Sequence, residues 1–139
     1  MNLVRLIMIG MTLVTGYAVA GDPVARNDTG ITRKDLLTAP LAARTEISRV
    51  EIKQITLAPN VKAPLHLHPC PVVGMVTVGT IAFQIEKKPI QYLKAGDAFY
   101  EPAQAHIARF DNGGKSPAQF TAVYLVCDSS QELVRILSK

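Results

Sequence analysis

Short stretches of alternating apolar and polar residues, separated by turn residues, recur through most of this chain and limit what it can fold into. Over residues 46–57, apolar side chains largely alternate with charged or polar ones, the pattern of a half-buried strand. Further β-rich runs follow, at 72–78, 80–86, 90–93, 98–100, 106–110 and 119–127. Short strands at intervals of about 8–12 residues are typical of an antiparallel sandwich or barrel. The sequence therefore predicts an all-β domain over residues 46–139, a single antiparallel β-barrel or jelly roll.

Helix is an alternative in two places only. A short helix would suit the sequence near Leu36 and Leu37. Ser129 and Glu132 have the spacing of a capping box that would open a terminal helix. Because residues 133–137 suit a closing strand about as well, we expect the strand there.

Residues 1–20 have the features of a secretory signal peptide. Arg5 supplies a positive charge, residues 6–16 are apolar, and Ala18-Val19-Ala20 is a small-x-small cleavage pattern. Since the apolar run is shorter than the roughly 20 residues that a spanning helix needs, we expect cleavage after Ala20 rather than a retained anchor. Residues 21–45, which have little apolar periodicity at their start, then form an extended N-terminal arm. The protein is expected to be periplasmic or secreted, with no membrane contact after cleavage.

The formal net charge is +4, but the basic residues are scattered along the chain. A nucleic-acid-binding or polybasic membrane surface needs clustered basic residues, so neither partner is expected. A small-molecule ligand or substrate remains the expected partner.

Export bears on the two cysteines, Cys70 and Cys127, because an oxidising compartment permits a disulfide. Two buried free thiols, or one thiol near a reactive site, are the alternatives. The sequence alone does not place the two Cα atoms within bridging distance, so the disulfide is a preference and the alternatives stay open.

The chain has three histidines, and two of them, His66 and His68, are separated by one residue. In a strand such residues project to the same face, so the two imidazoles would form a bidentate metal site. Solvated surface histidines are the alternative for an isolated pair of this kind. His106 follows a break at Pro102, and a strand after that break would bring it alongside the pair.

Residues 60–112 contain two motifs that resemble those of the cupin family. The first family motif is glycine, five residues, H-x-H, three or four residues, glutamate, six residues, glycine. His66, His68 and Gly79 match it in spacing, whereas Asn60 stands at the first glycine and Val72 at the glutamate.

The second family motif is glycine, five residues, proline, one residue, glycine, two residues, histidine, three residues, asparagine. Gly96 and Pro102 match it, Gln104 replaces the second glycine, His106 comes one residue early, and Asn112 comes two residues late when counted from His106. The chain thus resembles a small single-domain cupin with degenerate motifs. The resemblance implies a small β-barrel that commonly forms a homodimer.

In the family, a metal inside the barrel is held by the histidines and glutamate of the first motif and the histidine of the second. Because Val72 cannot ligate a metal, the resemblance implies His66, His68 and His106 as the ligands, with the remaining positions open to water or substrate. Imidazole suits Fe(II), Zn(II), Cu(II), Ni(II) and Mn(II), so the identity of this divalent metal stays open.

Three neighbours could modify the site. Glu101 is a direct ligand, a partner to an imidazole N–H, or a solvated loop carboxylate, and we rank the direct ligand below the other two. Gln104 is either a turn residue or a hydrogen-bond donor beside the ligands. A Cys70 thiolate ligand ranks below a disulfide or an inert thiol.

Three functions are compatible with these features. The first is an exported metal-binding enzyme, for example an oxygenase or isomerase acting on a small organic molecule. The second is a non-catalytic barrel that binds a small ligand with no catalytic metal, and the third is a structural role as a homodimer. We expect the first, because all three histidines fall on or next to motif positions; the reaction class rests on analogy with the fold family.

Overall fold

The computed structural model describes residues 30–41, 44–128 and 132–138. The chain divides into two compact units, residues 1–34 and 35–139, and the strands described below belong to the second. The predicted signal peptide lies outside the described residues, so its cleavage stays a prediction, as do the boundaries of the arm. The described part of the chain contains no helix that is long and apolar enough to cross a membrane.

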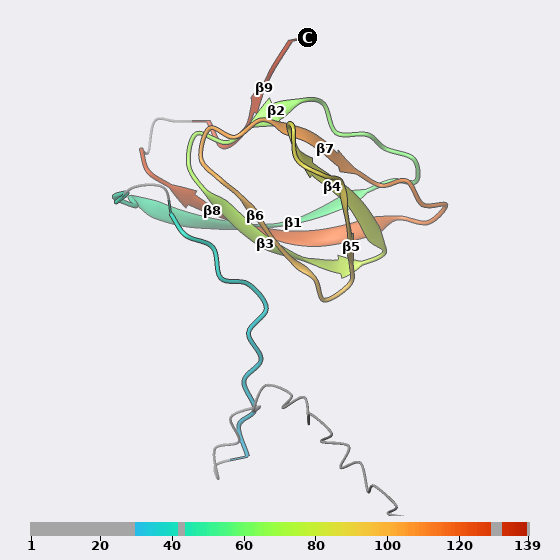
Figure 1. Ribbon diagram of the computed structural model, residues 1–139, viewed down its shortest axis with the longest axis horizontal. Helices are drawn as coiled ribbons and strands as arrows, with labels where there is room; N and C mark the ends of the chain where they lie inside the picture. Colours follow the sequence, from blue (N-terminus) through green and yellow to red (C-terminus); the bar gives the residue numbers. More distant parts are fainter. Residues whose placement is uncertain (1–29, 42–43, 129–131, 139) are drawn as a thin grey trace, which may run out of the picture. The chain divides into compact units, whose positions relative to one another are not determined.

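Two antiparallel sheets enclose the interior of the second unit (Figure 1). The four-stranded sheet has the order β1 (Arg49–Leu57), β8 (Ala118–Val126), β3 (Val72–Val78) and β6 (Ala98–Glu101). The five-stranded sheet has the order β5 (Gln91–Lys94), β4 (Thr80–Ile85), β7 (Ile107–Asp111), β2 (His66–Leu67) and β9 (Arg135–Ile136). Strands distant in sequence lie side by side, which is the arrangement of a jelly roll.

The all-β prediction is confirmed, and each predicted run coincides with a strand to within a few residues. The alternating pattern succeeds because side chains of a strand that faces a core on one side must alternate between core and solvent. Within the described ranges the strands form two separate sheets and not one closed barrel. The short helix near Leu36 and Leu37 does not form, and a short closing strand, β9, lies within the predicted run 133–137.

The chain's four phenylalanines pack together between the sheets. The ring centroids of Phe83, Phe99, Phe110 and Phe120 lie 4.7–6.3 Å apart in their contacting pairs. Each such buried side chain stabilises the fold by about 1.5–3 kcal/mol. Gly74 completes this packing, because a Cβ at that position would overlap the Phe99 ring and a backbone carbonyl oxygen.

Asn112 joins the end of β1 to the loop that follows β7. Its side chain is almost fully buried, and Nδ2 donates to the carbonyl oxygens of Leu57, Ala58 and Ser116. Its Oδ1 accepts the N–H of Gly114. Because every polar atom of the amide is paired, this buried group stabilises the loop instead of carrying a desolvation penalty.

Two residues that stand at glycine positions of the cupin motifs keep the glycine conformation. Asn60 and Gln104 have φ values of 60° and 62°. A residue with a Cβ costs about 1–2 kcal/mol in this left-handed region, although asparagine tolerates it comparatively well. Both positions thus have a backbone conformation that glycine adopts at no steric cost.

Candidate metal centre

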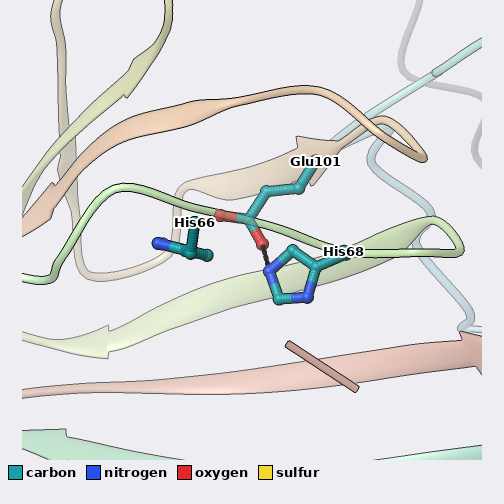
Figure 2. A group of neighbouring side chains, drawn as sticks. All are labelled: His66, His68 and Glu101. Carbon is teal, nitrogen blue, oxygen red and sulfur yellow. Dashed lines mark ion pairs between the residues drawn. The ribbon is translucent and has the colours of Figure 1, made fainter. Parts of the chain in front are cut away.

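Three buried side chains with metal-binding atoms meet between the two sheets (Figure 2). His66 lies in β2, His68 directly follows that strand, and Glu101 is the last residue of β6. Their exposed fractions are 8%, 3% and 4%. The candidate ligand atoms of the three residues all lie within 4.8 Å of one another. We call this group the two-histidine–glutamate centre.

The carboxylate enters the centre from β6 because of the register between two neighbouring strands. Phe99 and Glu101 are buried and alternate with the half-buried Ala98 and Tyr100 in β6, so both point into the interior. Glu101 is directly opposite Val72 of β3. Val72 stands at the glutamate position of the first cupin motif, and Glu101 therefore brings a carboxylate to the neighbouring position across the sheet.

Backbone carbonyls hold both imidazole rings. Nδ1 of His66 donates to the carbonyl oxygen of Pro64 at 2.7 Å, and Nδ1 of His68 donates to that of Leu133 at 2.7 Å. A proton on Nδ1 leaves Nε2 of a neutral imidazole with a lone pair, which is the form that binds a metal. Such outer hydrogen bonds fix the tautomer and ring orientation of metal-binding histidines.

The Glu101 carboxylate is only half paired by protein groups. Its Oε2 lies 2.9 Å from Nε2 of His68, whereas Oε1 is buried without a hydrogen-bond partner among the described residues. Leaving a buried charged acceptor unpaired costs more than about 1–3 kcal/mol. A cation bound by Nε2 of both histidines and by this carboxylate would remove that penalty, so the donor set fits a divalent transition metal.

The pKa values of His68 and of the neighbouring Tyr124 are both raised, for different reasons. Burial lowers the pKa of His68, but the hydrogen bond and charge of Glu101, together with the Leu133 carbonyl, outweigh burial and hold that pKa above its usual value. Burial and the charges of Glu101 and Glu51 raise the pKa of Tyr124. The Tyr124 phenol, whose ring packs on His68 with centroids 5.7 Å apart, is therefore protonated at neutral pH.

A pocket of about 110 Å³ adjoins the centre. The three residues of the centre and Tyr124 form its polar wall. The rest of its lining is apolar: Leu57, Ala63, Phe110, Phe120, Ala122 and Val134. A ligand in this pocket would contact the centre directly and would lie against apolar side chains elsewhere.

His106 does not join the centre, which corrects the expected set of three histidine ligands. In β7, Ile107 is fully buried and pairs with His66, so the preceding side chain points to the opposite face. His106 is 45% exposed in its side chain, and its Nδ1 lies 3.1 Å from a carboxylate oxygen of Glu86. The one-residue offset of His106 from the cupin motif thus moves its imidazole out of the interior.

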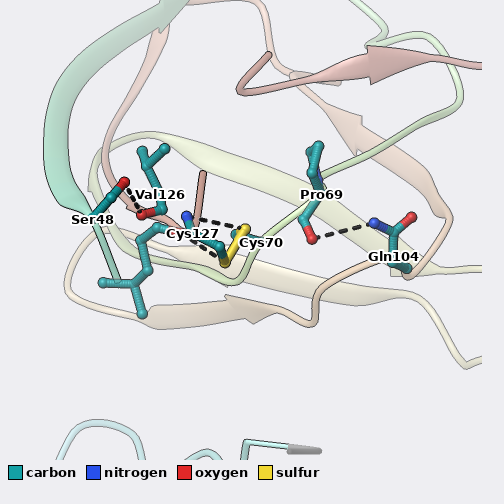
Figure 3. Close-up of a disulfide and its surroundings, with 7 residues drawn as sticks. Ser48, Pro69, Cys70, Gln104, Val126 and Cys127 are labelled. Carbon is teal, nitrogen blue, oxygen red and sulfur yellow. Dashed lines mark hydrogen bonds between the residues drawn. A yellow bond between two sulfur atoms is a disulfide. The ribbon is translucent and has the colours of Figure 1, made fainter. Parts of the chain in front are cut away.

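A disulfide and hydrogen bonds from Gln104 hold the segment that follows His68 (Figure 3). Cys70 and Cys127 form a disulfide with their Cα atoms 6.0 Å apart, which joins this segment to the end of β8 and leaves neither sulfur free for a metal. Gln104 acts as a donor near the ligands: its backbone N–H bonds to the carbonyl oxygen of His68 at 2.8 Å, and its Nε2 bonds to that of Pro69 at 3.2 Å.

Of the alternatives for Glu101, the solvated loop carboxylate is wrong, because the side chain is buried beside Nε2 of His68. The sequence predicts Tyr124 as a core or barrel-lining residue but does not distinguish it as a pocket residue. A signal for Glu101 was present, because the alternation that buries Phe99 also buries Glu101. The missing information was the pairing partner of β6. The sequence holds no such signal for Tyr124, because several aromatic or apolar residues of the same alternating strand could equally line a pocket.

The family profile of the Cupin domain, Cupin_2, matches residues 53–124. A comparison with curated proteins found no match. Among solved structures, an oxalate oxidase in complex with the substrate analogue glycolate is 22% identical, with a TM-score of 0.54 over 63% of this chain and 46% of its own. This chain thus spans less than half of that protein.

Two further structures are similar over more of their own length. A protein with a double-stranded β-helix domain from Klebsiella pneumoniae is 18% identical, with a TM-score of 0.54 over 71% of this chain and 82% of its own. The polyketide cyclase RemF from Streptomyces resistomycificus is 20% identical, with a TM-score of 0.55 over 66% of this chain and 62% of its own. At these identities the likeness shows the fold alone. With the profile match over residues 53–124, it establishes that the chain belongs to the cupin family.

Proposed function

We propose that this chain is an exported cupin that binds a divalent transition metal through His66, His68 and Glu101 and acts on a small organic molecule. The observation that carries the proposal is the unpaired, buried Oε1 of Glu101 beside two imidazoles whose Nδ1 atoms are already bonded to carbonyls. A divalent cation would pair with this oxygen and with Nε2 of both imidazoles. The proposed reaction is that of a metal-dependent oxygenase or isomerase.

The donor set narrows the chemistry without selecting one metal. Two imidazoles and one carboxylate suit Fe(II), the usual metal of such triads with open positions, and also Mn(II), Zn(II), Ni(II) and Cu(II). The bound metal would supply Lewis acidity toward a ligand in the adjoining pocket. His66 and His68 would hold it through Nε2, Glu101 would supply negative charge, and the apolar walls would contact the body of the ligand.

Export is part of the proposal. It is supported by the sequence of residues 1–20 and by the disulfide, since disulfides persist mainly in oxidising compartments. Mass spectrometry of the protein recovered from a periplasmic fraction or culture medium tests it. A mature chain that begins at Gly21 is expected, and an intact Met1 in the purified protein would contradict export by cleavage.

Elemental analysis of protein purified without chelators or a polyhistidine tag tests the metal proposal. About one metal per chain is expected in the wild type and in His106→Ala, which removes an exposed imidazole outside the centre. His66→Ala, His68→Ala and Glu101→Ala should lose the metal. Wild-type protein that stays empty after reconstitution, or equal loss in His106→Ala and His68→Ala, would contradict the proposal.

A second function, a non-catalytic barrel that binds a small ligand without metal, is favoured by the ion pair between His68 and Glu101. At 2.9 Å the two side chains partly satisfy each other when His68 is protonated. This alternative predicts that chelator-treated protein still shows a ligand-dependent rise in melting temperature and no turnover. Substrate consumption that disappears with Glu101→Ala would exclude it.

We also propose that the chain forms a homodimer through the outer face of the four-stranded sheet. Ile52, Val123, Val73 and Tyr100 lie directly opposite one another across its four strands. Ile52 is 68% exposed, and Val50 on the same face is 53% exposed. Apolar side chains gathered in this way often mark an interface. Light scattering should give twice the chain mass at micromolar concentration and the chain mass for Ile52→Lys; a monomeric wild type would contradict the dimer.

A further inference from the structure

The pocket beside the centre restricts the kind of molecule that can reach the metal. We propose that its ligand is a short aliphatic monoanion, with one oxygen-bearing head at the metal and an uncharged apolar body, as in a small monocarboxylate. This inference rests on the proposed metal site and names its ligand class.

The walls away from the centre offer almost nothing to a polar ligand. Leu57, Ala63, Phe110, Phe120, Ala122 and Val134 present only apolar side chains to the pocket. The Tyr124 hydroxyl is the remaining polar side-chain group of the lining. A ligand with hydroxyl or charged groups along its body would bury them without partners, which costs several kcal/mol for each group.

The volume sets the size of that body. The pocket measures about 110 Å³, somewhat less than the roughly 150 Å³ apolar cavity that accommodates benzene. A ligand held inside therefore has at most about six non-hydrogen atoms, the number in benzene. Butyrate is at this limit, with its carboxylate at the metal and three carbons against the apolar walls.

Charge selects a single negative head. A divalent cation with the Glu101 carboxylate leaves the centre with one net positive charge, and a monoanionic head neutralises it. A second carboxylate would be left in the apolar part of the pocket. Among the residues that the structure describes, no lysine or arginine lines the pocket; Arg49 and Lys53, on the neighbouring strand β1, are both ion-paired with Glu51.

Tyr124 completes the recognition of the head. Its ring packs on His68, which places the phenol beside the metal-binding imidazole. A phenol is protonated at neutral pH and can donate a hydrogen bond to a carboxylate oxygen. The head is therefore bound by the metal and by one hydrogen bond, while the body is bound by apolar contact.

Calorimetric titration of the metal-loaded protein with carboxylates of increasing length tests the assignment. From acetate to propionate to butyrate the affinity should rise by about fourfold for each added methylene. Succinate, which has the same four-carbon length as butyrate but a second carboxylate, should bind at least about tenfold more weakly. Succinate binding as tightly as butyrate, or affinity that does not rise with chain length, would overturn the inference.

Matched variants locate the effect in the pocket. Val134→Thr places a hydroxyl in the apolar wall at nearly constant volume and should weaken butyrate binding several-fold, with metal content unchanged. Val78→Thr makes the same replacement at a half-exposed position outside the pocket lining and should leave butyrate binding as it is. Equal effects of the two variants would overturn the assignment of the pocket. Metal analysis of each sample separates the failures: an empty wild type overturns the metal proposal, whereas a loaded protein with reversed selectivity overturns only the ligand class.

Discussion

Replacing both cysteines with alanine should remove about 4 kcal/mol from the free energy of unfolding. The disulfide joins Cys70 and Cys127, which are 57 residues apart in sequence. For a closed loop of about that length, the chain-entropy relation gives about 14 cal/mol/K, or about 4 kcal/mol at 25 °C. This is a large fraction of the roughly 5–15 kcal/mol by which a single domain is stable.

Urea denaturation of the oxidised wild type and the Cys70→Ala/Cys127→Ala double variant measures this difference directly. In a separate thermal unfolding experiment, the melting temperature of the double variant should be about 15–20 °C below that of the wild type, given the entropy of unfolding of a domain of about 100 residues. Adding a reductant should bring the wild type to the stability of the double variant and leave the double variant unchanged. Removing both cysteines together avoids a free thiol that would complicate the comparison.

A loss smaller than about 1 kcal/mol would refute this account of the disulfide. It would mean that the unfolded chain already keeps residues 70 and 127 close, or that other contacts fasten this end of the structure. Ser48 is the relevant neighbour, because its Oγ and its N–H both bond to the carbonyl oxygen of Val126, at 2.9 and 2.8 Å. Ser48→Ala in the double-variant background distinguishes the second explanation from the first.

Three further predictions concern the centre and the core. In chelator-treated protein, the interaction that raises the pKa of His68 stabilises the folded state. Its contribution is fully present below the unfolded pKa of about 6.5 and is lost as the pH rises through the raised pKa. Urea titrations between pH 5 and 9 should show this loss of stability in the wild type and not in Glu101→Gln. Deleting residues 132–139 removes the Leu133 carbonyl that orients His68 and should lower metal affinity about 10–100-fold in competition with a chromogenic chelator, and unchanged affinity would argue against that role. Gly74→Ala should destabilise the fold by about 1–3 kcal/mol in thermal unfolding, because its Cβ meets both the Phe99 ring and backbone, and a neutral effect would show that the sheets can separate freely there.

The strands were predictable because the signal for them is local. Residues facing a core on one side and solvent on the other alternate with a period of two, and that alternation is visible in any window of a few residues. The shared direction of His66 and His68 follows from the same rule. The sandwich of antiparallel sheets follows from the number and spacing of the strands.

The third member of the centre was not predictable in this way. His106 and Glu101 are five residues apart in sequence and lie on either side of the turn at Pro102. From the sequence alone, either side chain could reach the histidine pair. The choice between them depends on which residue of β7 pairs with His66 and which residue of β6 pairs with Val72. A shift of one residue in either register would turn every side chain of that strand to the other face.

The sequence by itself determined the fold class, the positions of the strands and the pair of histidines on one side of the chain. Only the tertiary structure decided that Ile107 takes the interior place next to His66, that Glu101 supplies the carboxylate opposite Val72, and that the two cysteines meet. The reason is physical: alternation is set by each strand's own backbone geometry, whereas pairing register is set by the packing of residues far apart in the chain.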